Sequence, residues 1–394
     1  MAGRGHDGLY YEESWRWGQS LAISPSLWSD DGTRFRWGQP TISAAMAWPM
    51  HDRRTALKAI GTFAATAVLP SAVLKAQGAG PKPPRLRPRD TVGLVQPAGF
   101  IADEFDLQLA LETITAMGLI PKPAPHLLAR FGYLAGTDEA RAADLNAMYA
   151  DDRVRAVFAV RGGWGSARIL PHLDFDLIRA NPKLLIGFSD ITALHMAFAA
   201  RAGFPTIHGP NAGGAWGKLS WNAFKSLAFD GETPIYRNPK ATEDRLVQRD
   251  WRTQTIRPGK AVGRLIGGNL TVLSALMGTP YLPSFDRAIL FLEDVDEAEY
   301  RIDRMLTQLA LAGVLRRVAG VVFGQCTNCK ASGPSYGGFT VSQVLKQHLQ
   351  PLGVPVFQGA LIGHVADQFS MPIGVRAEMD ATAGTIRILE PAVS

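Results

Sequence analysis

The fold is decided by residues 184–203, which read LLIGFSDITALHMAFAARAG. The apolar run LLIGF has the length of a buried strand, and the residues after the serine show the apolar spacing of a helix. A strand followed directly by a helix is typical of α/β proteins, in which neighbouring strands run parallel. The stretch therefore predicts a parallel sheet with helices on both faces.

The alternation of strand and helix continues on both sides of this stretch. In the N-terminal half, strands are predicted from 91, at 155–160 and at 204–210, and helices at 105–117 and 137–151, with Thr137 as an N-cap. In the C-terminal half, strands are predicted at 261–267, 288–294, 318–324 and 354–359, with two more at 370–389, and helices at 269–278, 297–313 and 341–350. We predict an α/β domain at 91–225, a linker at 226–257 and a second domain, richer in β-structure, at 258–394.

The first 49 residues show neither helical nor strand periodicity. Five of the nine tryptophans of the chain fall before residue 50. We predict that residues 1–49 are a disordered extension, or that translation begins later, at Met46 or Met50. N-terminal sequencing of the native protein distinguishes these two interpretations.

Residues 50–79 are typical of an export signal. Arg53 and Arg54 precede a short apolar run at 59–74, and a proline-rich linker follows at 80–90. The pattern resembles a twin-arginine signal and predicts a periplasmic protein. The alternative is an amphipathic helix with a basic first turn, which would leave the protein in the cytoplasm. The apolar run is shorter than the roughly 20 residues of a membrane span, so we expect no stable membrane insertion after cleavage.

The composition excludes several classes of protein. Hydrophobic residues make up 46% and charged residues 19%, which is typical of a globular chain. The net charge of +6 is modest, and no block of Lys and Arg suits a phosphate backbone, so we expect no nucleic-acid partner. Cys326 and Cys329 form a CxxC without a second pair, which is too little for a zinc site. A local disulfide and two packed thiols both stay open.

Ser189 is the first candidate for chemistry. It stands between the predicted strand and helix of the opening stretch. A serine on a sharp strand-to-helix turn exposes its hydroxyl, and the backbone N–H of Asp190 can then point at a developing oxyanion. The alternative is that Ser189 or Asp190 caps the helix.

The glycine-rich sequence RGGWGSAR at 161–168 follows another predicted strand. Its glycines permit close backbone approach, so its N–H groups can supply the second half of an oxyanion hole. It lacks the lysine and the glycine spacing of a phosphate loop, which argues against nucleotide binding. A plain glycine turn is the remaining interpretation.

Acids and histidines complete the set of candidates. Glu293 and Asp294 end an apolar strand, where a carboxylate must be solvated, paired or used. Other acids follow at 296–299, but no histidine is near enough in sequence to predict a metal site. His364 and His208 follow strands, whereas His195 lies on the helix after Ser189 and is expected to point elsewhere.

Taken together and in order, these motifs resemble the LD-carboxypeptidase family of serine peptidases, which includes muramoyltetrapeptide carboxypeptidases. The resemblance covers residues 84–391. The matching stretches are VQPAG (95–99), RGGWGSARILPHLD (161–174), IGFSDITALH (186–195), HGP (208–210), GGNLTVLSALMGTP (267–280), ILFLEDVDEAEYRIDRMLTQL (289–309) and GHVADQFSMPIG (363–374).

The resemblance implies a Ser–Glu–His triad, which maps to Ser189, Glu293 and His364. It also implies an oxyanion hole formed by the backbone N–H groups of Asp190 and Gly163. The implied fold is a flavodoxin-like parallel-sheet domain followed by a smaller, barrel-like α/β domain, with no cofactor and with homodimers common. The implied reaction removes the terminal D-alanine of a murein tetrapeptide by hydrolysing an L,D peptide bond. The family's recycling role is cytoplasmic, so the predicted export signal puts the physiological substrate in doubt.

Two other functions stay open. Microcin C self-immunity peptidases share the triad but cleave a peptidyl or aminoacyl nucleotide. An added aromatic ring that stacks on the base would favour this function, and the sequence alone does not assign that position to Trp164 or Trp216. A non-catalytic periplasmic binding protein also fits two α/β domains and an export signal, and it would lack an activated serine. Arg301 and Arg304 are possible partners of a substrate carboxylate, although pairing with Glu297 or Asp303 on their own helix is the alternative.

Overall fold

The computed structural model describes residues 81–394 apart from 241–245, 249 and 331–337. These residues all belong to one of the two units of the chain, Val73–Ser394. The predicted extension and export signal lie outside the described residues. Among the described helices, none has the length and apolar content needed to cross a membrane.

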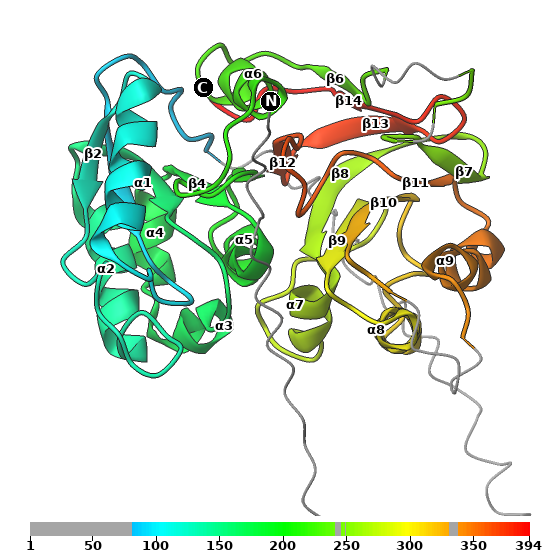
Figure 1. Cartoon of the computed structure of the whole chain (residues 1–394), viewed down its shortest axis with the longest axis horizontal. Coiled ribbons are helices and arrows are strands. Elements are labelled where there is room, and N and C mark those ends of the chain that lie inside the picture. The colour runs from blue at the N-terminus through cyan, green and yellow to red at the C-terminus, as the bar shows by residue number, and fades with distance from the viewer. Residues whose placement is uncertain (1–80, 241–245, 249, 331–337) are drawn as a thin grey trace, which may run out of the picture. The chain divides into compact units, whose positions relative to one another are not determined.

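The first sheet has six strands in the order β12-β5-β4-β3-β1-β2. Its strands are β1 (Thr91–Val95), β2 (Ile120–Pro123), β3 (Val154–Ala159), β4 (Leu184–Gly187), β5 (Thr206–His208) and β12 (Met371–Ile373). All pairs are parallel except β12 with β5. The connecting helices are α1 (Glu104–Ala116), α2 (Asp138–Ala150), α3 (Ser166–Ile169), α4 (Phe175–Ala180), α5 (Thr192–Arg201) and α6 (Lys218–Ala228) (Figure 1). The predicted parallel sheet is therefore confirmed, and Thr137 caps α2 as expected.

The second sheet has eight strands in the order β6-β14-β13-β8-β9-β10-β11-β7. Its strands are β6 (Ile235–Arg237), β7 (Gln254–Arg257), β8 (Lys260–Asn269), β9 (Ile289–Val295), β10 (Gly320–Thr327), β11 (Val356–Gln358), β13 (Arg376–Asp380) and β14 (Thr385–Ile388). Its helices are α7 (Leu270–Ala275), α8 (Glu299–Leu311) and α9 (Val341–Leu349). Strands β8 to β11 are parallel, and antiparallel strands flank them. The predicted α/β class, with a second part richer in β-structure, is confirmed.

Two segments of the chain belong to sheets in which the sequence analysis did not place them. The predicted linker, 226–257, contains β6 and β7, which stand at the two ends of the second sheet. Strand β12, from the predicted C-terminal domain, is an edge strand of the first sheet and pairs with β5. The chain therefore crosses between the two sheets more than once.

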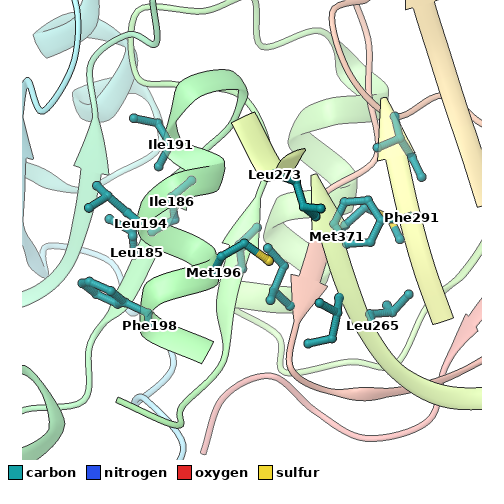
Figure 2. Close-up of a cluster of buried hydrophobic side chains, with 14 of the residues drawn as sticks. Leu185, Ile186, Ile191, Leu194, Met196, Phe198, Leu265, Leu273, Phe291 and Met371 are labelled. Carbon is teal, nitrogen blue, oxygen red and sulfur yellow. The ribbon is translucent and has the colours of Figure 1, made fainter. Parts of the chain in front are cut away.

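Helix α5 is central to the core. Leu194, Met196 and Phe198 on this helix are fully buried, as are Leu265 of β8 and Phe291 of β9. Figure 2 shows the side chains of α5 together with those of β4 on one side and of β8, β9 and β12 on the other. Because the turn that begins at Ser189 leads directly into α5, this packing fixes the position of the serine relative to β9.

Candidate active site

Ser189 occupies a sharp turn between β4 and α5. It opens a short 3-10 turn, Ser189–Ile191, that leads into the helix. Its φ of 64° lies in the left-handed region, which is rare for any residue except glycine and typical of a nucleophile held on a strand-to-helix turn. A Cβ on Gly162 would lie 3.0 Å from Ser189 Cβ, so Gly162 packs closely against the serine.

Ser189, His364 and Glu293 form a chain of hydrogen bonds. Ser189 Oγ lies 2.9 Å from His364 Nε2, and His364 Nδ1 lies 2.8 Å from Glu293 Oε2. A carboxylate only accepts hydrogen bonds, so Nδ1 carries the proton and Nε2 accepts from the serine hydroxyl. The structure therefore brings together the three residues that the sequence proposed from three distant segments.

The position of His364 is fixed by the close contact between Glu293 and Gly363. Glu293 is fully buried in β9, and His364 follows a turn in which Gly363 has a φ of 110°. A Cβ on Gly363 would lie 2.5 Å from Glu293 Oε2. Only a glycine lets the histidine loop pass this close to the carboxylate.

The surroundings of His364 shift its pKa upward. Burial by itself lowers the pKa of an imidazole, because it disfavours the charged form. The hydrogen bond to Glu293 and its charge, with smaller contributions from Asp294 and Asp296, outweigh burial and raise the pKa of His364. The site thus stabilises an imidazolium at the position where a general base would receive a proton.

Asp294, the neighbour of Glu293, has a structural role. Its carboxylate accepts hydrogen bonds from Asn269 Nδ2 at 3.0 Å and from Thr271 Oγ1 at 2.9 Å. Burial, reinforced by the charge of Glu293, raises the pKa of Asp294 to about 6. The bonds join β9 to the start of α7, where Asn269 is the N-cap.

The glycine-rich loop lies beside the serine. Gly163 has a φ of 110°, and a Cβ there would meet Gly99 at 3.3 Å. Asp190 Oδ2 accepts a hydrogen bond from the backbone N–H of Ser166 at 2.7 Å, which ties this loop to the turn after Ser189. The interpretation that Ser189 or Asp190 caps the helix after the serine is wrong, because neither side chain caps the 3-10 turn or α5.

Arg141 is a residue that the sequence analysis missed. Its guanidinium is 1% exposed and donates to Gly165 O at 2.9 Å and to Pro97 O, with Asp138 as its ion-pair partner. It therefore connects the loop after β1, which contains Pro97, to the glycine-rich loop, which contains Gly163 and Gly165. A signal was present, because Arg141 shares the i, i+4, i+7 stripe of α2 with the buried Leu145 and Met148.

The other two candidate histidines lie beneath the site and outside the hydrogen-bonded chain. His195 Nε2 donates to Gly187 O at 2.8 Å, and its Nδ1 faces Thr206 Oγ1 at 2.9 Å, so His195 supports the strand end before Ser189. His208 is fully buried, and its ring nitrogens have no hydrogen-bond partner among the described residues. Burial lowers the pKa of both histidines, that of His195 to about 4.

The CxxC lies next to the histidine loop. Cys326 and Cys329 form a disulfide, which decides between the two interpretations left open by the sequence. Between the two cysteines, Thr327 Oγ1 donates to His364 O at 2.7 Å.

Arg301 lies on α8 and pairs with Glu297 at 3.5 Å. This ion pair is the alternative that the sequence analysis gave to a role of Arg301 in binding a substrate carboxylate. Within the described residues, no three His, Cys, Asp or Glu side chains are grouped to hold a metal ion.

Two family models match the chain over most of the described residues. The LD-carboxypeptidase N-terminal domain matches residues 92–209, and the LD-carboxypeptidase C-terminal domain matches residues 262–379. The chain belongs to the LD-carboxypeptidase family. Ser189 lies in the first matched segment of this family, and Glu293 and His364 lie in the second.

Named relatives extend over nearly the whole described chain. A probable murein peptide carboxypeptidase of Bacillus subtilis is 38% identical over 321 residues, which cover 79% of this chain and 95% of the relative. The murein tetrapeptide carboxypeptidase of Pseudomonas aeruginosa is 32% identical, over 73% of this chain and 92% of the relative.

Solved structures share the fold. The muramoyltetrapeptide carboxypeptidase of Oxalobacter formigenes is 28% identical, covers 76% of this chain and 97% of its own, and has a TM-score of 0.64. The microcin C7 self-immunity protein MccF, in complex with glutamyl sulfamoyl guanosine, has a TM-score of 0.72 at 24% identity, over 79% of this chain and 99% of its own.

Proposed function

We propose that this LD-carboxypeptidase family member is a serine peptidase that hydrolyses an L,D peptide bond and releases the terminal D-alanine of murein tetrapeptides. The observation that carries the proposal is the hydrogen-bonded chain from Ser189 through His364 to Glu293. The names of the Bacillus and Pseudomonas relatives support the substrate class.

In the proposed reaction, Ser189 Oγ attacks the scissile carbonyl carbon while its proton passes to His364 Nε2. Glu293 holds the imidazole by the Nδ1 proton and stabilises the imidazolium. His364 then gives the proton to the nitrogen of the departing D-alanine, which leaves an acyl ester on Ser189. Water attacks the ester with His364 again as base, and the serine is restored.

The oxyanion of each tetrahedral intermediate needs donors that are already in place. We propose the backbone N–H groups of Asp190 and Gly163. Asp190 follows Ser189 directly in the turn between β4 and α5. Gly163 has a positive φ, and the preceding residue, Gly162, packs against Ser189.

The test is mass spectrometry of a murein tetrapeptide incubated with the full chain, with Ser189→Ala as the matched variant. The proposal requires D-alanine to be released by the wild type and the release to be lost in the variant. Release by both proteins would exclude Ser189 as the nucleophile. A folded wild-type protein that releases no D-alanine would exclude the substrate.

A second candidate is cleavage of a peptidyl or aminoacyl nucleotide, as proposed for a microcin-immunity-like enzyme. The observation that favours it is Trp164, which is 47% exposed beside Gly163 and offers a free ring for a base. Trp216 is less suitable, because its Nε1 donates to Asn211 O at 3.0 Å and its ring packs on Phe224. Parallel assays with an aminoacyl sulfamoyl or phosphoryl adenosine rank the two substrates, and binding without turnover of either would favour the binding-protein alternative.

A further inference from the structure

A pocket of about 480 Å³ opens beside the glycine-rich loop. It is lined by Gly99, Phe100, Tyr133, Arg161, Gly163 and Trp164. Gly163 approaches Gly99 closely, and the adjacent Gly162 packs against Ser189. The pocket therefore adjoins the proposed nucleophile and the proposed oxyanion hole.

Arg161 is the one charged residue that lines this pocket. Its backbone N–H donates to Gln96 Oε1 at 3.1 Å, and its Nη1 donates to Phe100 O at 3.0 Å. A guanidinium has five N–H donors, so one bond orients the side chain and leaves the others for a ligand. Among the described residues, no carboxylate forms an ion pair with it, in contrast to Arg168 on α3, which pairs with Asp138.

Three aromatic side chains line the same pocket as Arg161. Tyr133 is 61% and Trp164 is 47% exposed, and the guanidinium of Arg130 covers the ring of Phe100 at 4.0 Å. A pocket that combines exposed aromatic side chains with a charged side chain is typical of a ligand site. When a ligand covers these rings and excludes water, the attraction between the cation and an anion becomes stronger.

We propose that Arg161 binds the terminal carboxylate of the departing D-amino acid, and this inference rests on the proposed carboxypeptidase activity. In a substrate that loses one residue, the carboxylate is one residue from the scissile carbonyl. Arg161 is two residues from Gly163, a separation of up to about 7 Å along the chain, and its long side chain bridges such a distance. A planar guanidinium matches a carboxylate with two parallel hydrogen bonds, which is how this site distinguishes a chain end from an internal peptide bond.

The experiment compares two substrates, the tetrapeptide with a free terminal carboxylate and the same peptide with a terminal carboxamide. Arg161→Gln is the test variant. Arg155→Gln is the matched control, because it removes the same charge from an exposed position near the start of β3, the strand that precedes Arg161. Both variants alter exposed side chains, and thermal melting checks that they fold like the wild type.

The wild type and the control are expected to prefer the acid over the amide by about 10- to 100-fold in kcat/KM, as hydrogen bonds to a charged group contribute. Arg161→Gln is expected to lose this preference, through a higher KM for the acid and little change for the amide. Arg161→Lys, which keeps the charge without the planar fork, is expected to lie in between.

Two results overturn the inference while leaving the proposed function intact: a wild type that releases D-alanine but accepts both substrates equally, or an Arg161→Gln variant that keeps the full preference for the acid. A folded wild type that releases neither D-alanine nor D-alaninamide instead contradicts the proposed function itself. The subsite at Arg161 is then excluded along with it.

Discussion

At the scale of single residues, His364 sets the pH dependence of the proposed reaction. A general base must be neutral, and the surroundings of His364 raise its pKa above the ordinary value of about 6.5. The midpoint of the acid limb of kcat/KM is therefore expected above pH 6.5. Glu293→Gln removes the negative charge that raises this pKa, so the midpoint is expected at lower pH, with kcat reduced by roughly 10³- to 10⁴-fold.

Rates of D-alanine release between pH 5 and 9 check this prediction. The Glu293→Gln variant is slow, so defining the acid limb of its kcat/KM profile requires long incubations and a Ser189→Ala blank. The same midpoint pH for Glu293→Gln and the wild type would show that Glu293 does not control the protonation of His364.

Gly363 offers a second test of the same contact. Alanine at this position places a Cβ 2.5 Å from Glu293 Oε2, so Glu293 and His364 must move apart. A shift of this size is expected to lower kcat by about 100-fold. Gly353→Ala is the control, since Gly353 also has a positive φ, 76°, but no atom within 4 Å of the added carbon.

Both glycine variants pay for the unfavourable φ, at about 1 kcal/mol of stability. Urea unfolding should therefore show a loss of stability in both variants, with a larger loss for Gly363→Ala because of its added contact with Glu293, whereas only Gly363→Ala loses activity. Equal activity of the two variants would mean that the close contact does not position the histidine.

The sequence identified the three residues of the site, but it could not derive their contact. Ser189 and His364 are 175 residues apart, and Glu293 and His364 are 71 apart. Residue types at strand ends indicated chemistry at each position separately, with capping as an equally simple explanation for Ser189. Only the resemblance to the family's ordered motifs assigned the three residues to one site, because tertiary contacts over such separations leave no local periodicity in the sequence.

At the scale of secondary-structure elements, long periodic segments were predicted well and short polar strands were not. β3, β4, α2 and α8 follow from apolar runs or stripes. In contrast, β6 and β7 have only 3 and 4 residues, with one buried side chain each, so nothing local distinguishes them from a linker. They are strands because backbone groups of β14 and β11 pair with them.

Arg141 shows how one element positions the loops of another. It reaches from α2 to Gly165 O and Pro97 O, so Arg141→Met leaves both carbonyl groups without this donor. We expect the free energy of unfolding to fall by about 3 kcal/mol and kcat/KM to fall because the glycine-rich loop is no longer fixed. Asp138→Asn is the control, since it removes the ion pair of Arg141 and leaves both carbonyl contacts.

Urea unfolding and the kcat and KM of each variant, measured at a temperature where both are folded, test this role. A positioning role predicts a lower kcat for Arg141→Met, whereas Asp138→Asn should keep the kcat of the wild type. An Arg141→Met protein that is destabilised but has the wild-type kcat would limit the residue to stability.

At the scale of the whole molecule, buried histidines make stability depend on pH. Burial lowers the pKa of His195 to about 4, whereas an unfolded chain has a histidine pKa of about 6.5. Between these values the unfolded state binds a proton that the folded state does not, so stability falls as the pH drops from 6.5 through 4. Asp294 acts in the opposite direction, because burial raises the pKa of its carboxyl to about 6 and the folded state then binds the proton first.

The contribution of His195 is therefore isolated by comparing variants. His195→Gln keeps a donor for Gly187 O but does not titrate, so its loss of stability from pH 7 to pH 5 is expected to be smaller than that of the wild type by about 2 kcal/mol. Phe198→Leu, a buried and uncharged change on the same helix, should lower stability at both pH values and keep the wild-type difference between them. Urea unfolding at pH 7 and pH 5 measures these differences. Equal pH dependence in His195→Gln and the wild type would show that a proton reaches His195 without unfolding the core around α5, on which the position of Ser189 depends.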